Sequence, residues 1–312
     1  MTFPPQQQPA LLYIKSNQAE VYRQLLQQSS LKTLPITDDK TQATIILADP
    51  PLLATQLHEF PKLSWVQSTF TGIDALTEPS LRKDYQLTNV KGIFGQLISE
   101  YVLGYSLSYF RHFQQYQQQQ QQALWQPHAY QSVANKKMII LGTGSIGAKL
   151  AQTASALGFL VIGVNRSGIT PKESTFEQCY SIDELDSALS QADIIVNTLP
   201  STQRTRKLIN QSHLSHCRDA LLFNVGRGDV IDDEGLLVAL EHHWVAHAFL
   251  DVFAVEPIAA THPYWQHPKV TVTPHIAATS FPEQVFEIFE QNVQRWMNQQ
   301  PLLNEVNFER GY

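Results

Sequence analysis

One glycine-rich segment, GTGSIG at residues 142–147, constrains the fold of this chain more than any other feature. A short apolar run at 137–141 precedes it, and an alanine- and leucine-rich stretch at 148–157 follows it and stops at Gly158. A second apolar, β-branched run occupies residues 159–164. We therefore predict a buried parallel strand, a tight turn, a helix and a second strand, which is the setting that a dinucleotide-binding turn requires.

Each position of this segment has a physical role in such a turn. Gly142 allows the tight turn, Gly144 lets the backbone approach a pyrophosphate, and Gly147 lets the helix pack closely on the strand. Ser145 and Ile146 open the helix, so their N–H groups can hold phosphate oxygens at the positive end of the helix dipole. The alternative is a glycine-rich turn that binds no ligand.

The residues that end the second strand bear on which nicotinamide cofactor binds. A site for NAD usually has an Asp or Glu about 20 residues into the motif, where it accepts hydrogen bonds from the ribose 2′-OH. Here no acidic residue occurs before Glu173. Arg166 can instead form a charge-assisted fork with a 2′-phosphate, and Asn165 and Ser167 can donate hydrogen bonds to it. We expect NADPH (NADP+) as the cofactor, with NADH less favoured, unless Arg166 is an ordinary solvated surface side chain.

Strand-like and helix-like segments continue to alternate after this point. The predicted helices span 182–189 and 233–240, and the predicted strands span 193–200, 220–225, 245–252 and 270–273. Such alternation gives a parallel, doubly wound sheet whose ligands bind beyond the carboxyl ends of the strands. Four polar residues lie at or just past those ends: Arg227, Asp251, Glu256 and His275.

Three of these residues fit the reduction of a 2-oxo acid. His275 is suited to be the general acid, because an unperturbed histidine titrates near neutral pH. Glu256 can orient the ring and favour its charged form from the other ring nitrogen. Arg227 can hold a substrate carboxylate and stabilise charge on the carbonyl oxygen. Taken singly, each residue has another interpretation. Arg227 could form a salt bridge between loops, Glu256 could be a surface charge, and His275 could cap a helix.

Three segments resemble the signatures of the D-isomer-specific 2-hydroxyacid dehydrogenases, and the resemblance extends over nearly the whole chain: 224–228 (NVGRG), 250–257 (LDVFAVEP) and 273–278 (TPHIAA). Three more resemble the glyoxylate/hydroxypyruvate reductase A branch of that family: 101–105 (YVLGY), 123–125 (ALW) and 310–312 (RGY). The resemblance implies NADPH-dependent reduction of small 2-oxo acids, such as glyoxylate and hydroxypyruvate, to 2-hydroxy acids. It also implies a homodimer.

The resemblance assigns roles to individual residues. It makes Arg227 a substrate-binding residue, His275 the acid/base that contacts the substrate, and Glu256 the partner of His275. Five residues would line the nicotinamide end of the cofactor site: Leu199, Pro200, Val225, Asp251 and Ala277.

A loop near the N-terminus matches the position of the family's substrate loop, which offers backbone N–H groups to a carboxylate. It contains Phe70, Thr71 and Gly72. Phe70 and Thr71 are bulkier than the family's usual Gly- and Ala-rich pattern, and this crowding favours small substrates. The alternative is an ordinary turn between a strand and a helix.

The N-terminal third independently indicates a second α/β domain. Its predicted strands span 11–14, 43–47, 63–67 and 85–90, and its predicted helices span 19–28 and 51–59. A helix at 99–113 crosses into the cofactor domain, and a helix at 282–297 with apolar residues at helical spacing returns. The predicted fold class is α/β with two doubly wound domains. A Rossmann cofactor domain at 101–280 is inserted in a flavodoxin-like substrate domain formed by 1–100 and 281–312.

Composition excludes several other classes of protein. Two cysteines are too few for a disulfide framework, and no apolar run approaches the about 18 residues of a membrane span. A net charge of −6 argues against generic nucleic-acid binding. His213 and His216 lie beside Cys217 without a matching carboxylate cluster, so we expect no metal. The glutamine run at 114–122 is expected to be a solvated helix end or loop, and the protein is expected in the cytoplasm.

Two alternatives to a small-acid reductase remain at this point. The first is another dehydrogenase of the same family, acting on phosphoglycerate or on a bulkier 2-oxo acid. The second is a non-enzymatic NAD(P)-binding interaction protein on the same fold. The complete Arg227, Glu256 and His275 set argues against the second alternative.

Overall fold

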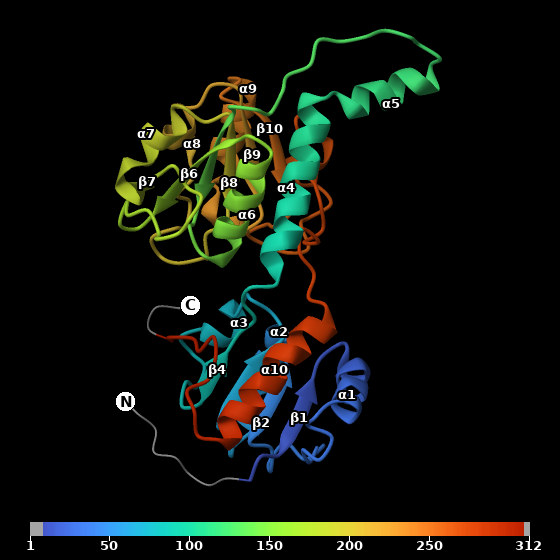
Figure 1. The fold of residues 1–312 in the computed structure, drawn as a ribbon, viewed down its shortest axis with the longest axis vertical. Helices are drawn as coiled ribbons and strands as arrows, with labels where there is room; N and C mark the ends of the chain where they lie inside the picture. Colours follow the sequence, from blue (N-terminus) through green and yellow to red (C-terminus); the bar gives the residue numbers. More distant parts are fainter. Residues whose placement is uncertain (1–8, 309–312) are drawn as a thin grey trace. The chain divides into compact units, whose positions relative to one another are not determined.

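The computed structural model describes residues 9–308 and divides the chain into two compact α/β units (Figure 1). Unit 1 comprises residues 1–93 and 280–312, and unit 2 comprises residues 94–279. Both contain a parallel sheet with helices, which confirms the predicted fold class. The C-terminal segment 310–312, which contributed to the resemblance, lies outside the described residues.

Unit 2 is built on a seven-stranded sheet in which every neighbouring pair is parallel, in the order β11-β10-β9-β8-β5-β6-β7. The strand order reverses between β5 and β8, where a doubly wound sheet binds its ligand. The bounds are β5 (Lys137–Leu141), β6 (Leu160–Asn165), β7 (Gln178–Ser181), β8 (Ile194–Asn197), β9 (Ala220–Asn224), β10 (Val245–Leu250) and β11 (Val270–Val272).

Helices cover both faces of this sheet, so its inner strands are apolar on both sides. Ile139 and Leu141 of β5 pack in a core with residues of α7, α8 and α9. Met138 and Ile140 point the other way, into a core with residues of α4 and α6. The bounds are α4 (Phe94–Phe110), α6 (Ser145–Ala156), η2 (Ile182–Glu184), α7 (Leu185–Leu189), α8 (Gln211–Leu214), η3 (Gly228–Val230), α9 (Asp233–Glu241) and η4 (Pro263–Gln266).

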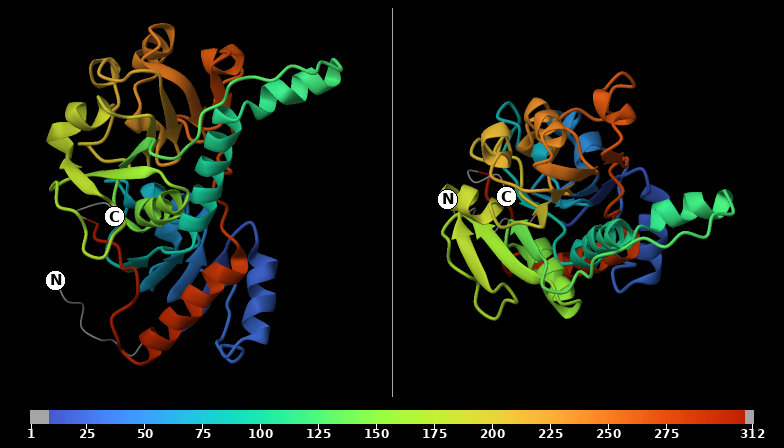
Figure 2. Two further views of the ribbon diagram at one scale, coloured as in Figure 1. Left: turned by 45° about the horizontal axis from the view of Figure 1, so that its top comes forward. Right: turned by 90° about the horizontal axis from the view of Figure 1, so that it is seen from above.

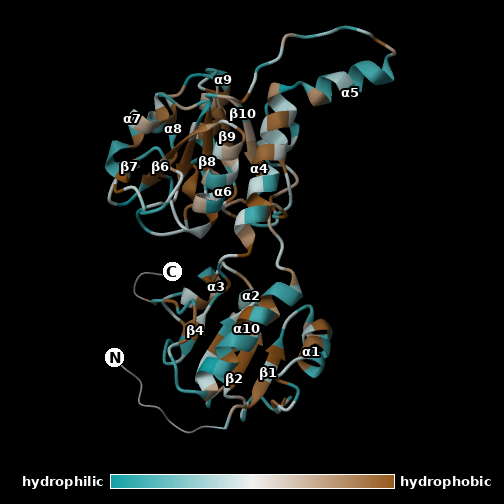
Figure 3. Cartoon of the chain, in the orientation of Figure 1, coloured by the Kyte–Doolittle hydropathy of each residue, from teal (hydrophilic) through white to brown (hydrophobic). Residues whose placement is uncertain are grey.

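The glutamine run forms a helix of its own, α5 (Phe113–Gln121), which projects from the body of unit 2 (Figures 1 and 2). The prediction of one helix at 99–113 is therefore corrected at both ends. That helix, α4, begins at Phe94 and ends at Phe110, and His112 then adopts φ 56°, which breaks the helical path. Figure 3 shows α5 as hydrophilic, in contrast to the apolar strands of the sheet.

The described part of unit 1 has four parallel strands in the order β1-β2-β3-β4, and an isolated parallel bridge joins Ile36 to Leu12 of β1. Counting this bridge as an edge position gives the flavodoxin order 2-1-3-4-5. Trp65 of β3 stacks between Phe289 and Trp296 of α10, so the C-terminal helix packs on this sheet. The bounds are β1 (Leu12–Lys15), α1 (Ala19–Gln28), β2 (Ile45–Ala48), α2 (Pro50–Ala54), η1 (Leu57–Glu59), β3 (Trp65–Ser68), α3 (Asp74–Thr77), β4 (Gln86–Thr88) and α10 (Pro282–Met297).

Candidate active site

The glycine-rich turn connects β5 to α6 and is packed too tightly for larger residues. Gly142 has φ +102°, in the left-handed region that favours glycine. A Cβ placed on Gly147 would lie 2.0 Å from the carbonyl oxygen of Gly142, so the helix and the turn touch directly. A Cβ on Gly144 would meet nothing within 4 Å, which leaves open space beside the start of α6.

The start of α6 is suited to bind an anion. The helix begins at Ser145, with Gly144 as its N-cap residue and no capping hydrogen bond from a side chain. The N–H groups of Ser145 and Ile146 are therefore among those at the positive end of the helix dipole. The turn and the helix start together fit a dinucleotide pyrophosphate.

Asn165 ends β6, and Arg166 and Ser167 follow it on an exposed loop. The Asn165 side chain faces into the loop: its Oδ1 accepts a hydrogen bond from the Gly168 N–H at 2.8 Å, and its Nδ2 donates to the Ile169 carbonyl at 2.8 Å. The Arg166 side chain, by contrast, has no hydrogen bond or ion pair with any described residue. The loop therefore presents the guanidinium of Arg166 to solvent, while the amide of Asn165 is used within the chain.

The loops that follow β8 and β9 are in direct contact. A Cβ on Gly226 would lie 2.7 Å from the carbonyl oxygen of Leu199, so only glycine fits between them. Leu199 is half-buried, Pro200 is exposed, and Val225 is buried against the core that contains α4 and α6. The structure thus brings together three of the residues predicted to line the nicotinamide end of the cofactor site.

Two buried asparagines that sequence reasoning missed hold these loops in place. Asn197 ends β8 and donates from Nδ2 to Oδ1 of Asn224, which ends β9, at 2.8 Å. Asn197 Oδ1 accepts from the Leu199 N–H at 3.1 Å, and Asn224 Nδ2 donates to the Arg227 carbonyl at 3.1 Å. The signal available in the sequence was an asparagine at the end of each of two otherwise apolar strands.

The loop that carries Arg227 lies against the loop that carries Glu256. A Cβ on Gly228 would lie 1.9 Å from the carbonyl carbon of Phe253, so the two backbones touch. The Phe253 N–H donates to Oε1 of Glu256 at 2.9 Å, which orients that carboxylate. Arg227 is half-buried, and its Nη1 donates to the Gly226 carbonyl at 2.8 Å.

Glu256 and His275 form the predicted pair. His275 Nδ1 and Glu256 Oε2 are 2.8 Å apart, and the two side chains are 55% and 35% exposed, respectively. Because Glu256 occupies Nδ1, Nε2 is the ring nitrogen available for a substrate. His275 has φ 53°, so it sits in a sharp turn directly after β11.

Asp251, at the end of β10, fixes that turn. The residue is 2% exposed, and its carboxylate accepts hydrogen bonds from Thr273 Oγ1 at 2.6 Å and from the N–H groups of Ile276 at 2.8 Å and Ala277 at 2.9 Å. The Asp251 carbonyl accepts from the His275 N–H at 2.9 Å. A buried carboxylate with several donors is strongly held, so Asp251 anchors the backbone on both sides of His275.

Tyr101 of α4 extends this anchor. Its hydroxyl lies 2.7 Å from Thr273 Oγ1, which also donates to Asp251. Burial raises the pKa of Tyr101 above its usual value, so the hydroxyl keeps its proton. Sequence reasoning used Tyr101 only for the resemblance and did not find this contact.

The predicted substrate loop lies in unit 1, between β3 and β4. Phe70 is 37% exposed, and its backbone is fixed by a hydrogen bond from the Val90 N–H to the Phe70 carbonyl at 3.3 Å. Thr71 Oγ1 donates to the Val90 carbonyl at 2.9 Å, and Asn89 Nδ2 donates to the Thr71 carbonyl at 2.9 Å. Gly72 is half-buried. The loop is therefore an ordered connection within unit 1.

Other polar clusters of unit 2 have structural partners. His213 and His216 both pair with Asp186, at 2.5 Å and 3.5 Å, and burial raises the pKa of the neighbouring Cys217 to about 12. Within residues 9–308 no group of His, Cys, Asp and Glu is arranged to hold a metal ion. The described helices also include none that is long and apolar enough to span a membrane.

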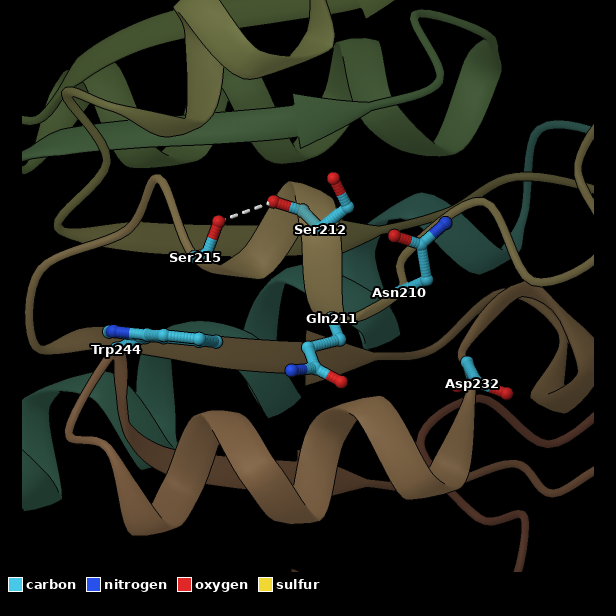
Figure 4. A pocket seen from close by; sticks show the side chains of 6 residues that line it. All are labelled: Asn210, Gln211, Ser212, Ser215, Asp232 and Trp244. Carbon is cyan, nitrogen blue, oxygen red and sulfur yellow. Dashed lines mark hydrogen bonds between the residues drawn. The ribbon is translucent and has the colours of Figure 1, made fainter.

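A hollow of about 420 Å³ in unit 2 lies beside α8, α9 and the start of β10 (Figure 4). It contains none of the residues predicted for the site. Its one carboxylate, Asp232, is paired with Lys207 at 2.8 Å and caps α9. The lining residues are Asn210, Gln211, Ser212, Ser215, Asp232 and Trp244.

Comparison with known proteins identifies relatives along most of the chain. Residues 103–277 match the family model of the D-isomer specific 2-hydroxyacid dehydrogenase, NAD binding domain. The chain is 34% identical over 281 residues to a glyoxylate/hydroxypyruvate reductase A of Serratia proteamaculans, a match that covers 86% of this chain and 88% of the relative.

Solved structures are similar over nearly the full length. A D-isomer specific 2-hydroxyacid dehydrogenase family protein from Aeromonas salmonicida has a TM-score of 0.90 and 42% identity, covering 96% of this chain and 99% of that chain. A D-isomer specific 2-hydroxyacid dehydrogenase from Xanthobacter autotrophicus, in complex with NADPH and MES, has a TM-score of 0.86 and 29% identity. That match covers 98% of this chain and 100% of that chain.

Proposed function

This chain belongs to the D-isomer-specific 2-hydroxyacid dehydrogenases and is an NAD(P)-dependent enzyme, and we propose that it uses NADPH to reduce glyoxylate and hydroxypyruvate to 2-hydroxy acids. The family inferred from the sequence is thereby confirmed. The observation that carries the proposed reaction is the 2.8 Å contact between His275 and Glu256, beside the loop that carries Arg227.

The proposed mechanism assigns a role to each of these side chains. When bound, the reduced nicotinamide supplies a hydride for the carbonyl carbon. His275 donates a proton from Nε2 to the carbonyl oxygen, and Glu256 on Nδ1 orients the ring. Arg227 binds the substrate carboxylate through paired hydrogen bonds and stabilises the negative charge that develops on the carbonyl oxygen.

Unit 2 is the proposed cofactor domain and unit 1 the proposed substrate domain. In unit 2, the turn at 142–147 holds the pyrophosphate and the loops at 199–200, 225 and 277 line the nicotinamide end. Arg166, on the loop that it shares with Ser167, holds the 2′-phosphate. The exposed guanidinium of Arg166 supports the preference for NADPH, as does the NADPH bound in the Xanthobacter structure.

The proposed substrates are small. The name of the Serratia relative, glyoxylate/hydroxypyruvate reductase A, supports both acids. The side chains of Phe70 and Thr71 are the physical support, because they are bulkier than Gly or Ala. We propose that this loop offers the N–H groups of Thr71 and Gly72 to the carboxylate, while the Phe70 N–H is bonded to Ser68 Oγ at 3.0 Å.

We further propose that the enzyme is a homodimer in the cytoplasm. Helix α5 and the segment after it project from unit 2 (Figure 2). They carry large exposed apolar side chains. Trp125 is 98% exposed and Tyr130 is 59% exposed, and burial against a second copy would remove this area from water. Cys179 and Cys217 are free thiols, in keeping with a reducing compartment.

The direct test is the oxidation of NADPH, followed by its near-ultraviolet absorbance, with a panel of 2-oxo acids. The proposal expects glyoxylate and hydroxypyruvate to be reduced with higher kcat/KM than pyruvate and longer acids. A clear preference for branched or aromatic 2-oxo acids, or reduction of NADP+ with phosphoglycerate in the reverse assay, would make it another dehydrogenase of the family. Binding of NADPH without turnover on any acid would favour the interaction protein.

A further inference from the structure

The Asn165 side chain makes five hydrogen bonds at the end of β6. Its Oδ1 accepts from the N–H groups of Ser167 at 3.0 Å and Gly168 at 2.8 Å, and from the Ser167 hydroxyl at 3.2 Å. Its Nδ2 donates to the Ile169 carbonyl at 2.8 Å and to Thr143 Oγ1 at 3.2 Å. A carboxamide is suited to this place because it carries both donors and an acceptor, whereas an aspartate would lack the donors.

The bond to Thr143 links two separate parts of the cofactor site. Thr143 lies inside the glycine-rich turn, between Gly142 and Gly144. A Cβ on Gly163 of β6 would lie 2.7 Å from the Thr143 methyl group, so that methyl packs directly over the strand. The hydroxyl of the same side chain reaches Asn165. One amide thus ties the proposed pyrophosphate turn to the loop that follows β6.

The far side of this loop is held by the edge strand β7. Gly168 has φ +70°, and a Cβ there would lie 3.0 Å from the Ser181 nitrogen at the end of β7. Asn165 therefore holds the loop from one side while β7 limits it from the other. Arg166 lies between these two constraints along the chain and has an exposed side chain.

We propose that Asn165 is a positioning residue for the 2′-phosphate of NADPH, which it serves by holding the Arg166–Ser167 loop rather than by contacting the phosphate. Both of its N–H bonds are already used, one on Ile169 and one on Thr143. The inference rests on the proposed NADPH preference. It adds that Asn165 holds the loop from which Arg166 reaches the 2′-phosphate.

The test measures binding of two cofactor fragments to the full chain by calorimetry. Adenosine 2′,5′-bisphosphate carries the 2′-phosphate, and 5′-AMP lacks it, so the ratio of their dissociation constants reports the 2′-phosphate alone. Asn165→Ala is expected to weaken the bisphosphate about tenfold, since several hydrogen bonds that order the loop are lost. The affinity for 5′-AMP should change less than about twofold.

A double-mutant cycle separates positioning from contact. If Asn165 acts through Arg166, then Asn165→Ala made in an Arg166→Ala background will cause little further loss of bisphosphate binding. If the two losses instead multiply, Asn165 contacts the phosphate itself and the positioning role is overturned.

Two further variants control for folding. Thr143→Val keeps the shape of the side chain but removes the hydroxyl, and it should weaken the bisphosphate about threefold while sparing 5′-AMP. Asn210→Ala is the matched control, because Asn210 also makes local bonds, accepting from the His213 N–H at 3.2 Å and donating to the Lys207 carbonyl at 3.2 Å. It lies beside the hollow in Figure 4 and should leave the ratio unchanged.

The outcomes distinguish this inference from the function on which it rests. If the wild-type protein binds both fragments equally, the NADPH preference fails, and this inference fails with it. If the wild type prefers the bisphosphate and Asn165→Ala keeps that preference, only the role of Asn165 is overturned. Should Asn165→Ala not fold, Thr143→Val decides, and an unchanged ratio in that variant counts against the inference.

Discussion

Two regions at the carboxyl edge of the unit 2 sheet hold their polar groups by different means. The cofactor end, formed by residues 142–147 and 165–168, relies on the backbone of tight glycines, on helix N–H groups and on an exposed guanidinium whose loop is held by the Asn165 side chain. The catalytic end, formed by residues 224–228, 251–256 and 273–277, relies on side chains that other buried side chains hold.

This difference predicts which property of the enzyme is lost when each region is mutated. Damage at the cofactor end should appear as weaker cofactor binding or as a changed cofactor preference. Damage at the catalytic end should appear as slower turnover of an enzyme that still binds its cofactor, because the hydrogen bonds of Asp251 and of the Asn197–Asn224 pair involve none of residues 142–147. Each of the following variants tests this division between cofactor binding and turnover.

The largest effect is expected at the catalytic end, from His275→Asn. Loss of a general acid lowers turnover by about two to four orders of magnitude, while the affinity for NADPH should stay within about twofold of wild type. Stopped-flow reduction and a fluorescence titration with NADPH measure the two quantities. Near-normal turnover in this variant would remove His275 from the acid role.

The second-largest effect is expected from Arg227→Ala, which should lower kcat/KM by about a hundredfold to a thousandfold. KM should rise and kcat should fall together, because one guanidinium binds the carboxylate and stabilises the developing oxyanion. Arg206→Ala is the control: this exposed arginine pairs with Asp229 at 3.2 Å on the surface, and its loss should change little. A rise in KM with unchanged kcat would restrict Arg227 to substrate binding.

At the cofactor end, Arg166→Ala should reduce the preference for NADPH over NADH by about tenfold to a hundredfold, the range of one charge-assisted hydrogen bond. The loss should come from a higher KM for NADPH, with KM for NADH nearly unchanged. Measuring kcat/KM with both cofactors in wild type and variant gives the result. A preference that survives the substitution would mean that the 2′-phosphate is held elsewhere.

The smallest effect is expected from Glu256→Gln, which keeps the shape of the side chain. Its kcat at the optimum should stay within about tenfold of wild type. The neutral amide lacks the negative charge of the carboxylate and holds the imidazole less firmly, so kcat should fall while the affinity for NADPH stays unchanged. An unchanged kcat would show that the 2.8 Å contact with His275 has no catalytic consequence.

Much of unit 2 could be predicted because its strands are buried on both faces and are therefore continuous apolar runs, as at Lys137–Leu141. The strand β7 (Gln178–Ser181) was missed since it is a short, half-exposed edge strand with polar residues. The end of α4 was misplaced because the break depends on His112 at φ 56°, and no glycine or proline marks it.

The two ends of the site also differ in how far the sequence predicts them. The cofactor end is local, so spacing alone located the glycines and Arg166. The anchors of the catalytic end join residues that are distant in the sequence, such as Asn197 to Asn224 and Tyr101 to Thr273. Spacing carries no information about such pairs, and Asn165 was interpreted as a phosphate donor because its contact with Thr143 is likewise long-range.

The most direct test of the division between the two regions measures the same two quantities in both Arg166→Ala and His275→Asn: the dissociation constant of NADPH, and kcat at saturating cofactor. We predict that Arg166→Ala raises only the dissociation constant, by about tenfold or more. We predict that His275→Asn lowers only kcat, by about a hundredfold or more. A loss of NADPH affinity in His275→Asn as large as its loss of turnover, or a comparable fall of saturated kcat in Arg166→Ala, would contradict this account.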